Sequence, residues 1–110
     1  MSEKIAFKMF LNQGMKNEYK RRHDLIKTEW KDVEIVLKQA GVKDYSIFLD
    51  EETNTLFATL WRDKNHTMDK LPENETIRKW WKYMSDIMVY RKDKPNEPYV
   101  VPLDMVFHMD

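Results

Sequence analysis

The sequence predicts an α+β fold in which strands and helices follow one another in the order β-α-β-β-α-β. Two observations carry this prediction. Hydrophobic residues alternate with polar ones in short segments typical of strands, and they recur at spacings of three and four in longer segments typical of helices. This order is the ferredoxin-like arrangement, a four-stranded antiparallel sheet with the helices on one face.

Each predicted element lies between turn residues. The strands are expected over residues 5–11, 42–50, 55–62 and 103–109, and the helices over residues 15–40 and 75–88. Gly41 suits the end of the first helix, because glycine adopts the left-handed conformation required there. A helix of roughly 26 residues would span about 39 Å, so a bend or break is expected within residues 24–28. A short helix is expected within the polar stretch 63–75, and an ordered loop over 89–101.

Large hydrophobic residues fall on both faces of the predicted strands. They include Ile5, Phe7, Phe10, Phe48, Phe57 and Trp61. The helices cover only one face of the sheet, so the other face would be left in water. The simplest cover is the sheet of a second copy, and the sequence therefore predicts a homodimer.

Length and composition exclude several classes of protein. The chain of 110 residues is expected to form a single domain over residues 1–110. Lys plus Arg number 19 and Asp plus Glu number 19, and this balance argues against binding to nucleic acid or to a charged membrane surface. The sequence has no cysteine for disulfides or thiol chemistry. It also lacks an apolar run of membrane-spanning length and a signal peptide, so a cytoplasmic location is expected.

His23 is the first candidate for catalysis. It follows Tyr19 by four residues and precedes Ile26 by three, so its imidazole is expected to face the sheet. One interpretation is a hydrogen-bonded core histidine. The other is a general acid/base in a pocket, since an unperturbed imidazole titrates near pH 6.5. The adjacent Arg21 and Arg22 are expected to be solvated.

Two pairs of aromatic residues are candidates for ligand binding. Trp80 and Trp81 point about 100° apart on a helix, so one is expected in the core and the other at a pocket wall or dimer contact. Their flat faces suit a sugar ring, and their indole N–H groups can donate to hydroxyls. Tyr19 and Tyr45 would supply phenolic hydroxyls. A purely structural role remains open for each of the four.

The remaining histidines give no metal signal. His66 lies in a polar stretch and His108 near the C-terminal end, and no spacing typical of zinc ligands links them to His23. Neither a glycine-rich phosphate loop nor a nucleophile elbow is present. We therefore expect neither a metal nor a cofactor.

Several tracts resemble the L-rhamnose mutarotase family. In chain order they are EYKRRH (18–23), YSIFLD (45–50), Asn54 with Leu56-Phe57-Ala58, WWKYM (80–84) with Asp86 and Met88, and VFHMD (106–110). The match extends over nearly the whole chain in the right order. EYKRRH and WWKYM are specific when they occur together.

This resemblance implies a cytoplasmic homodimer of the dimeric α/β barrel type that interconverts the α and β anomers of L-rhamnose. It implies that His23 is the proton donor. It implies sugar contacts for Tyr19, Tyr45, Trp80 and Trp81. Mutarotation requires acid/base catalysis but no cofactor.

The sequence departs from the family pattern in two places. The family commonly has a Trp-Pro pair shortly after the histidine, whereas this chain has Lys27-Thr28 there and Trp30 three residues after Lys27. The tryptophan that the family often has after the third strand is absent from residues 65–68. Both changes bear on the shape of the pocket and so on which sugar is preferred.

Two other function classes remain open. The same dimeric architecture occurs in haem-binding and cofactor-free monooxygenases, for which His23 would be a possible axial ligand. A non-catalytic binding module, such as an RNA-recognition module, shares the βαββαβ order. The zero net charge and the lack of an aromatic-glycine tract on the third strand weigh against RNA.

Overall fold

The computed structural model describes residues 2–110. The strands are β1 (Ser2–Phe10), β2 (Val42–Asp50), β3 (Thr55–Asp63) and β4 (Val101–Leu103). The α-helices are α1 (Lys16–Asp24), α2 (Lys31–Gln39) and α3 (Glu75–Met84), and the 3₁₀ helices are η1 (Leu25–Lys27) and η2 (Met68–Glu73). In this part of the chain, no helix is long and apolar enough to cross a membrane.

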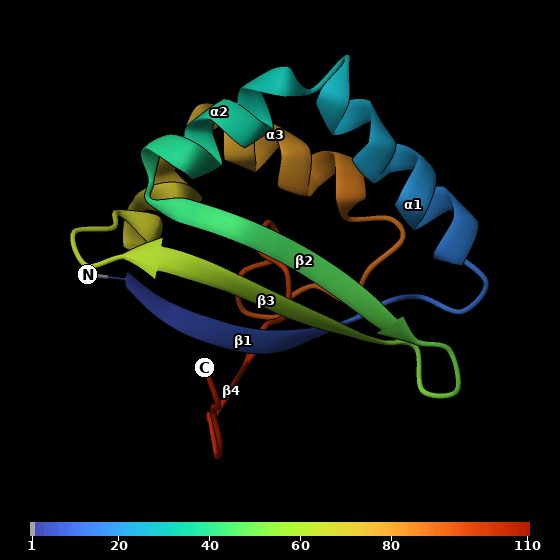
Figure 1. Ribbon diagram of the computed structural model, residues 1–110. Coiled ribbons are helices and arrows are strands. Elements are labelled where there is room, and N and C mark those ends of the chain that lie inside the picture. Colours follow the sequence, from blue (N-terminus) through green and yellow to red (C-terminus); the bar gives the residue numbers. More distant parts are fainter. Residues whose placement is uncertain (1) are drawn as a thin grey trace.

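The four strands form one antiparallel sheet in the order β2-β3-β1-β4. All three α-helices lie over the same face of this sheet, and the two central strands, β3 and β1, run the length of the molecule (Figure 1). The predicted ferredoxin-like class is thereby confirmed.

The alternation predicted for the strands separates two faces. In the register of β1 and β3, Phe7 pairs with Ala58 and Met9 with Leu56, and these residues point toward the helices. Ala58 and Leu56 are almost fully buried. They form the floor of the core, on which the helices place their apolar residues.

The first predicted helix is interrupted, as its length required. Three 3₁₀ residues, η1, follow α1, and α2 begins after Trp30. The backbone N–H of Trp30 donates to the carbonyl of Leu25 across the break. This lets the chain arch over the sheet (Figure 1). Gly41 follows the end of α2 with a φ of +95°, as expected for a glycine in this position.

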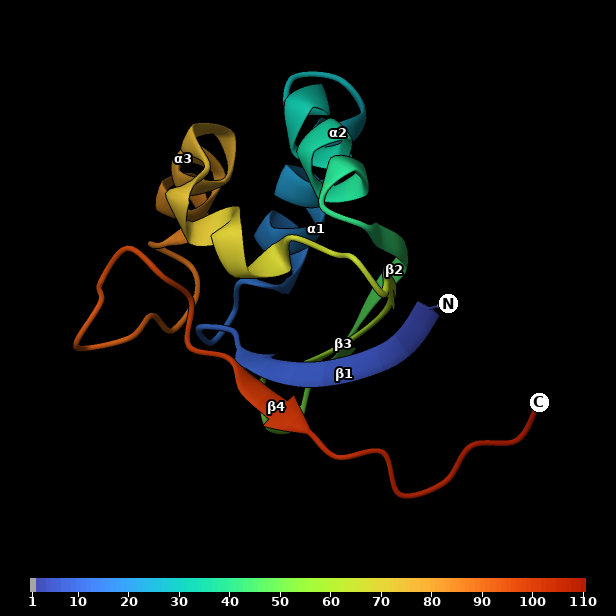
Figure 2. The same cartoon turned by 90° about the vertical axis from the view of Figure 1, so that its left-hand side faces the viewer.

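The prediction of a strand over residues 103–109 was wrong. β4 covers only Val101–Leu103, and residues 104–110 form no regular element. Figure 2 shows them leaving the body of the molecule as a C-terminal arm. The arm exposes Met105, Val106, Phe107 and Met109, with Val106 95% exposed. The pairing of β4 with β1 ends at Leu103 and Ala6, although β1 continues to Ser2, so alternation alone did not extend the strand.

The second predicted helix is shorter than expected, and the first strand is longer. α3 ends at Met84, and the next apolar residues, Ile87 and Met88, are buried in a turn and in a bridge to Leu11. Their spacing therefore reflects burial and not helical structure. β1 begins at Ser2 because its polar start pairs with the end of β3.

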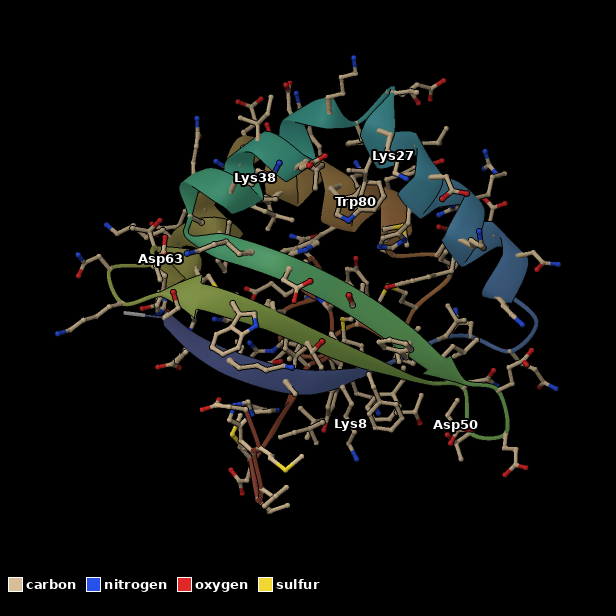
Figure 3. All side chains as sticks on the ribbon, in the orientation of Figure 1. Lys8, Lys27, Lys38, Asp50, Asp63 and Trp80 are labelled. Atoms are coloured by element: carbon tan, nitrogen blue, oxygen red, sulfur yellow. The ribbon has the colours of Figure 1, made fainter. Side chains whose placement is uncertain are left out.

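The face of the sheet that the helices leave uncovered is amphipathic. We call it the outer face; it carries Phe10, Phe48, Phe57 and Trp61, together with Lys4 and Lys8. Phe48 is 67% exposed. Lys8 lies on the side of the sheet opposite to the helices (Figure 3), and its ammonium is 5.8 Å from the Phe10 ring centroid.

Candidate active site

A cavity of about 1100 Å³ lies between the helices and the sheet. Each helix and strand that surrounds it contributes side chains. All the candidate site residues proposed from the sequence line this one cavity: Tyr19, His23, Tyr45, Trp80 and Trp81. Figure 3 labels Trp80 among the helices above the sheet.

His23 occupies the last turn of α1, and aromatic rings pack against its imidazole. The Tyr19 ring, one turn earlier, stacks on it with centroids 4.2 Å apart. The Trp80 ring, from α3, meets it edge-on at 5.2 Å and 89°. The prediction that His23 faces the space between helix and sheet is therefore confirmed.

The hydrogen bonding of His23 determines which of its nitrogens is free. Its Nδ1 lies 3.0 Å from the carbonyl oxygen of Tyr19. A carbonyl only accepts, so Nδ1–H donates, and the neutral ring then carries a lone pair on Nε2. Within residues 2–110, Nε2 has no hydrogen-bond partner. Burial lowers the pKa of His23, so the ring is neutral at pH 7.

Tyr19 and Tyr45 present two hydroxyls without partners. Neither hydroxyl has a hydrogen-bond partner in residues 2–110. Both side chains line the cavity, Tyr19 from α1 and Tyr45 from β2. Burial raises both pKa values, that of Tyr45 to about 12, so both phenols stay protonated at neutral pH.

A β-bulge in β2 precedes Tyr45. Lys43 pairs with Trp61 and Ser46 with Thr59, so two residues of β2 oppose one of β3. The extra residue, Asp44, has a φ of +49°. Bulges of this kind redirect a side chain, and here Tyr45, which is 39% exposed, lines the cavity next to the bulge.

The two adjacent tryptophans behave differently, as predicted, although both line the cavity. Trp80 is 7% exposed and belongs to the hydrophobic core. Trp81 is half-buried, and its carbonyl accepts a hydrogen bond from the Tyr90 hydroxyl. Because they come from one short helix, their relative position is well defined.

Sequence reasoning missed the residues behind this site. Trp30 packs edge-on against Trp80 and stacks on Tyr83, with both ring centroids 5.2 Å away. Trp30 follows His23 by seven residues, which is about two helical turns, and this spacing was the available signal. The expectation that Arg22 is solvated was wrong, because it is only 9% exposed and bonds to groups at the end of α3. The signal was available, because Arg22 follows Tyr19 by three residues and precedes Ile26 by four, whereas Arg21 lies only two residues after Tyr19.

In residues 2–110, no three His, Asp or Glu side chains gather in a way that could hold a metal ion. The cavity lining includes one imidazole, two phenols and two indoles, together with the charged side chains of Lys16, Lys20, Glu34, Lys38, Lys43, Asp44 and Arg62. This set can exchange protons with hydroxyl groups and can stack against a ring.

Comparisons with known proteins agree with this geometry. The family model of L-rhamnose mutarotase matches residues 4–109. An L-rhamnose mutarotase of Sinorhizobium fredii is 55% identical over 107 residues, covering 97% of this chain and 98% of the relative. One from Mesorhizobium japonicum is 55% identical over 109 residues, covering 99% of both.

A solved structure is also similar. The crystal structure of an L-rhamnose mutarotase from Formosa agariphila superposes with a TM-score of 0.85 at 45% sequence identity, covering 98% of this chain and 99% of that one. The similarity thus extends over sequence and fold alike. The chain belongs to the L-rhamnose mutarotase family.

Proposed function

We propose that this protein is an isomerase that interconverts the α and β anomers of L-rhamnose. The observation that carries the proposal is the free Nε2 of a neutral His23, facing a cavity that also receives two unbonded phenols. Family membership supports the choice of sugar. The lining is otherwise largely aliphatic, which suits the methyl group of a deoxyhexose.

In the proposed reaction, Nε2 of His23 first acts as a base. It takes the proton of the anomeric hydroxyl, the C1–O1 bond becomes a carbonyl, and the bond from C1 to the ring oxygen breaks. The ring oxygen must gain a proton as it leaves. Both oxygens are bound to C1, so the imidazolium formed in the first transfer lies within reach of the second.

Closure of the ring reverses these steps after the aldehyde has rotated about C1–C2. The ring oxygen returns its proton to Nε2 as it attacks C1, and O1 is reprotonated. His23 is therefore base and acid in turn, and the protein ends in its starting state. The proton donation expected of His23 is the second half of this cycle.

We propose that the aromatic residues hold the sugar during this rotation. The hydroxyls of Tyr19 and Tyr45 are free to bond to sugar hydroxyls, and the faces of Trp80 and Trp81 offer stacking surfaces. Holding the ring next to Nε2 makes the transfer effectively intramolecular, which is a large part of such catalysis.

The direct test is magnetisation exchange between the anomeric protons of L-rhamnose, measured by NMR with and without the protein. We expect faster exchange with the wild type. We expect His23→Ala to lose roughly a hundredfold or more of that acceleration. His108→Ala is the matched control, since His108 is paired only with Asp110 in the exposed arm.

Other outcomes of this test would contradict the proposal in distinct ways. Acceleration that survives His23→Ala would exclude His23 as the proton carrier. Faster anomer exchange of a different aldose, but not of L-rhamnose, would show that the proposed substrate is wrong. No exchange with any sugar, together with a Soret band on titration with haem, would favour the haem-binding alternative.

We also propose that the protein is a homodimer formed through the outer face and the C-terminal arm. Phe48 on the outer face and Val106 and Phe107 in the arm are 67%, 95% and 77% exposed. Single chains rarely leave so many large apolar groups in water. A second copy would cover them, and because Phe48 also lines the cavity, the interface would border the cavity.

We further propose that the protein serves rhamnose metabolism in the cytoplasm, as the family resemblance implies. The cysteine-free sequence suits a compartment in which disulfides do not form. Cell fractionation with an antibody to the protein tests the location. Recovery in a membrane or extracellular fraction would contradict it.

A further inference from the structure

Arg22 is the one charged side chain among the buried residues of positions 2–110, at 9% exposure. It immediately precedes His23 in α1, but it points to a different neighbour. α1 has only two buried residues, Tyr19 and Arg22. Tyr19 belongs to the hydrophobic core, and Arg22 is the buried polar attachment of this helix to the rest of the protein.

The guanidinium of Arg22 uses four hydrogen bonds. Nε donates to Glu18 Oε2 at 2.7 Å within α1. Nη1 donates to the Tyr83 carbonyl at 2.5 Å and to Asp86 Oδ1 at 2.7 Å. Nη2 donates to Asp86 Oδ2 at 3.2 Å, and the guanidinium carbon lies 4.6 Å from the Tyr83 ring centroid.

These contacts join α1 to the C-terminal end of α3. The Tyr83 carbonyl is in the last turn of α3, where carbonyls lack helical partners and a positive charge is favourable. Asp86 lies just beyond the helix, and its hydrogen bonds from Arg22 lower its pKa. A planar guanidinium that binds a carboxylate through two N–H groups fixes orientation as well as distance.

The two elements that Arg22 joins are those that carry the facing parts of the site. α1 carries His23, and α3 carries Trp80, whose ring meets the imidazole edge-on at 5.2 Å. The Tyr83 ring beneath the guanidinium also packs at 5.8 Å from Trp80. The position of His23 against α3 thus depends on the same few contacts that Arg22 makes.

We propose that Arg22 is a positioning residue, whose bonds to Tyr83 and Asp86 hold α1 so that His23 Nε2 stays in reach of the two sugar oxygens bound to C1. The inference rests on the proposed function and deepens it. Arg22 itself takes no part in proton transfer, because its guanidinium is fully engaged with the end of α3.

The test compares Arg22→Met with Arg21→Met. Arg21 is the adjacent arginine, 58% exposed and paired with Glu18 at the surface. We expect Arg22→Met to lower kcat for anomer exchange roughly tenfold or more, with KM changed less, because displacement affects the reacting group most. Tyr45, Trp80 and Trp81 come from other elements and still bind the sugar. We expect Arg21→Met to stay within about twofold of the wild type.

A spectroscopic measurement follows the position of His23 directly. The Hε1 proton of its imidazole lies among the ring currents of Tyr19 and Trp80. We expect its NMR chemical shift to differ from the wild-type value in Arg22→Met and to equal the wild-type value in Arg21→Met. A folded Arg22→Met with wild-type kcat and an unmoved His23 signal would overturn the proposal, and so would a loss confined to KM.

Asp86→Asn keeps the test decisive if Arg22→Met does not fold. The Asp86 side chain is 67% exposed, so replacing it with Asn leaves no buried unpaired charge at position 86. It must reproduce the loss of kcat and the shift of His23, and if it reproduces neither, the proposal fails. A wild type without mutarotase activity would reject the proposed function, whereas the His23 shift would still decide the role of Arg22.

Discussion

His23 is the side chain on which the proposed chemistry depends, and its surroundings predict the pH dependence. Burial lowers its pKa from the ordinary value of 6.5, so the neutral base is present throughout the neutral range. We expect kcat/KM for enzyme-dependent exchange to be constant above about pH 6.5 and to fall as the pH drops through the lowered pKa.

The opposite profile would identify a different resting form. If imidazolium were the form that begins the reaction, activity would increase as the pH falls. Subtracting the uncatalysed rate at each pH leaves the pH dependence of the enzyme-catalysed rate. His23→Ala provides the control, because its residual rate must lack the pH dependence that comes from titration of His23.

The Tyr45 hydroxyl is predicted to contribute to binding and not to the proton transfer. Tyr45→Phe removes a hydroxyl that has no partner in residues 2–110, so the free protein loses no hydrogen bond. We expect KM to increase by the value of one hydrogen bond, about 0.5–1.5 kcal/mol or roughly two- to twelvefold, with kcat nearly unchanged. Saturation kinetics of anomer exchange measure this.

Tyr99→Phe is the matched control for this measurement. Tyr99 is 45% exposed, and its ring packs on Phe10, outside the cavity. Its loss should leave both constants unchanged. If Tyr45→Phe behaved like the control, its hydroxyl would not contact the sugar.

The site residues that could be predicted are those whose spacing in the sequence determines which face of a helix they occupy. His23 and Tyr19 are four residues apart on a helix, so they had to share a face. Arg22 also lies on the buried side of the helix, three residues after Tyr19, but its ion pair with Asp86 has no signature in the sequence, because the two residues are 64 positions apart. Partners brought together only by the tertiary fold cannot be read from local spacing.

Helix α3 supplies both tryptophans, and its start depends on one side chain. Asn74 is the N-cap, and its Oδ1 accepts a hydrogen bond from the backbone N–H of Ile77 at 3.1 Å. Asn74→Ala leaves that N–H without its partner. We expect a loss of about 1 kcal/mol in the free energy of unfolding, measured with urea.

Asn65→Ala is the control for the cap, since Asn65 is an exposed turn residue. It should change the free energy of unfolding by less than about 0.5 kcal/mol. Equal effects of the two substitutions would mean that the cap contributes nothing specific. Because the cap is distant from the reacting groups, we expect kcat of the folded Asn74→Ala protein to stay near the wild-type value.

Elements with a buried face were predictable, and elements without one were not. β2 and β3 alternate because one side packs on the core, and their predicted bounds agree with the structure to within one residue. Residues 103–109 alternate just as well, but only Leu103 belongs to β4. Alternation indicates that a segment is suited to pairing, but it does not determine whether the segment pairs, since the edge of β1 that faces β4 is left unpaired at residues 2–5.

In the single chain, one face of the sheet is covered by helices and the other is exposed. The helices cover one face of the sheet and enclose the cavity, whereas the outer face keeps Phe48 and Phe57 exposed. A stable interface between two proteins buries about 1,200–2,000 Å² in total. The outer face and the arm together are the apolar surfaces available for such an interface.

We therefore expect sedimentation velocity to give twice the mass of the chain at micromolar concentration. Phe48→Asp places a charge on the outer face, and Val106→Asp with Phe107→Asp places charges in the arm. Each of these side chains is exposed in the single chain, so the substitutions should leave its fold intact. Both variants should sediment as monomers, because an unpaired charge is costly to bury.

Ile35→Asp is the control, because Ile35 is 51% exposed on α2, on the helical side of the sheet. It should remain dimeric. If both interface variants also remained dimeric, the two copies would have to meet elsewhere. If only the arm variant dissociated, the arm and not the sheet would hold the pair. Phe48 lies on the outer face and also lines the cavity, so activity lost with the dimer would come from displacement of Phe48 or of the strands that carry both faces.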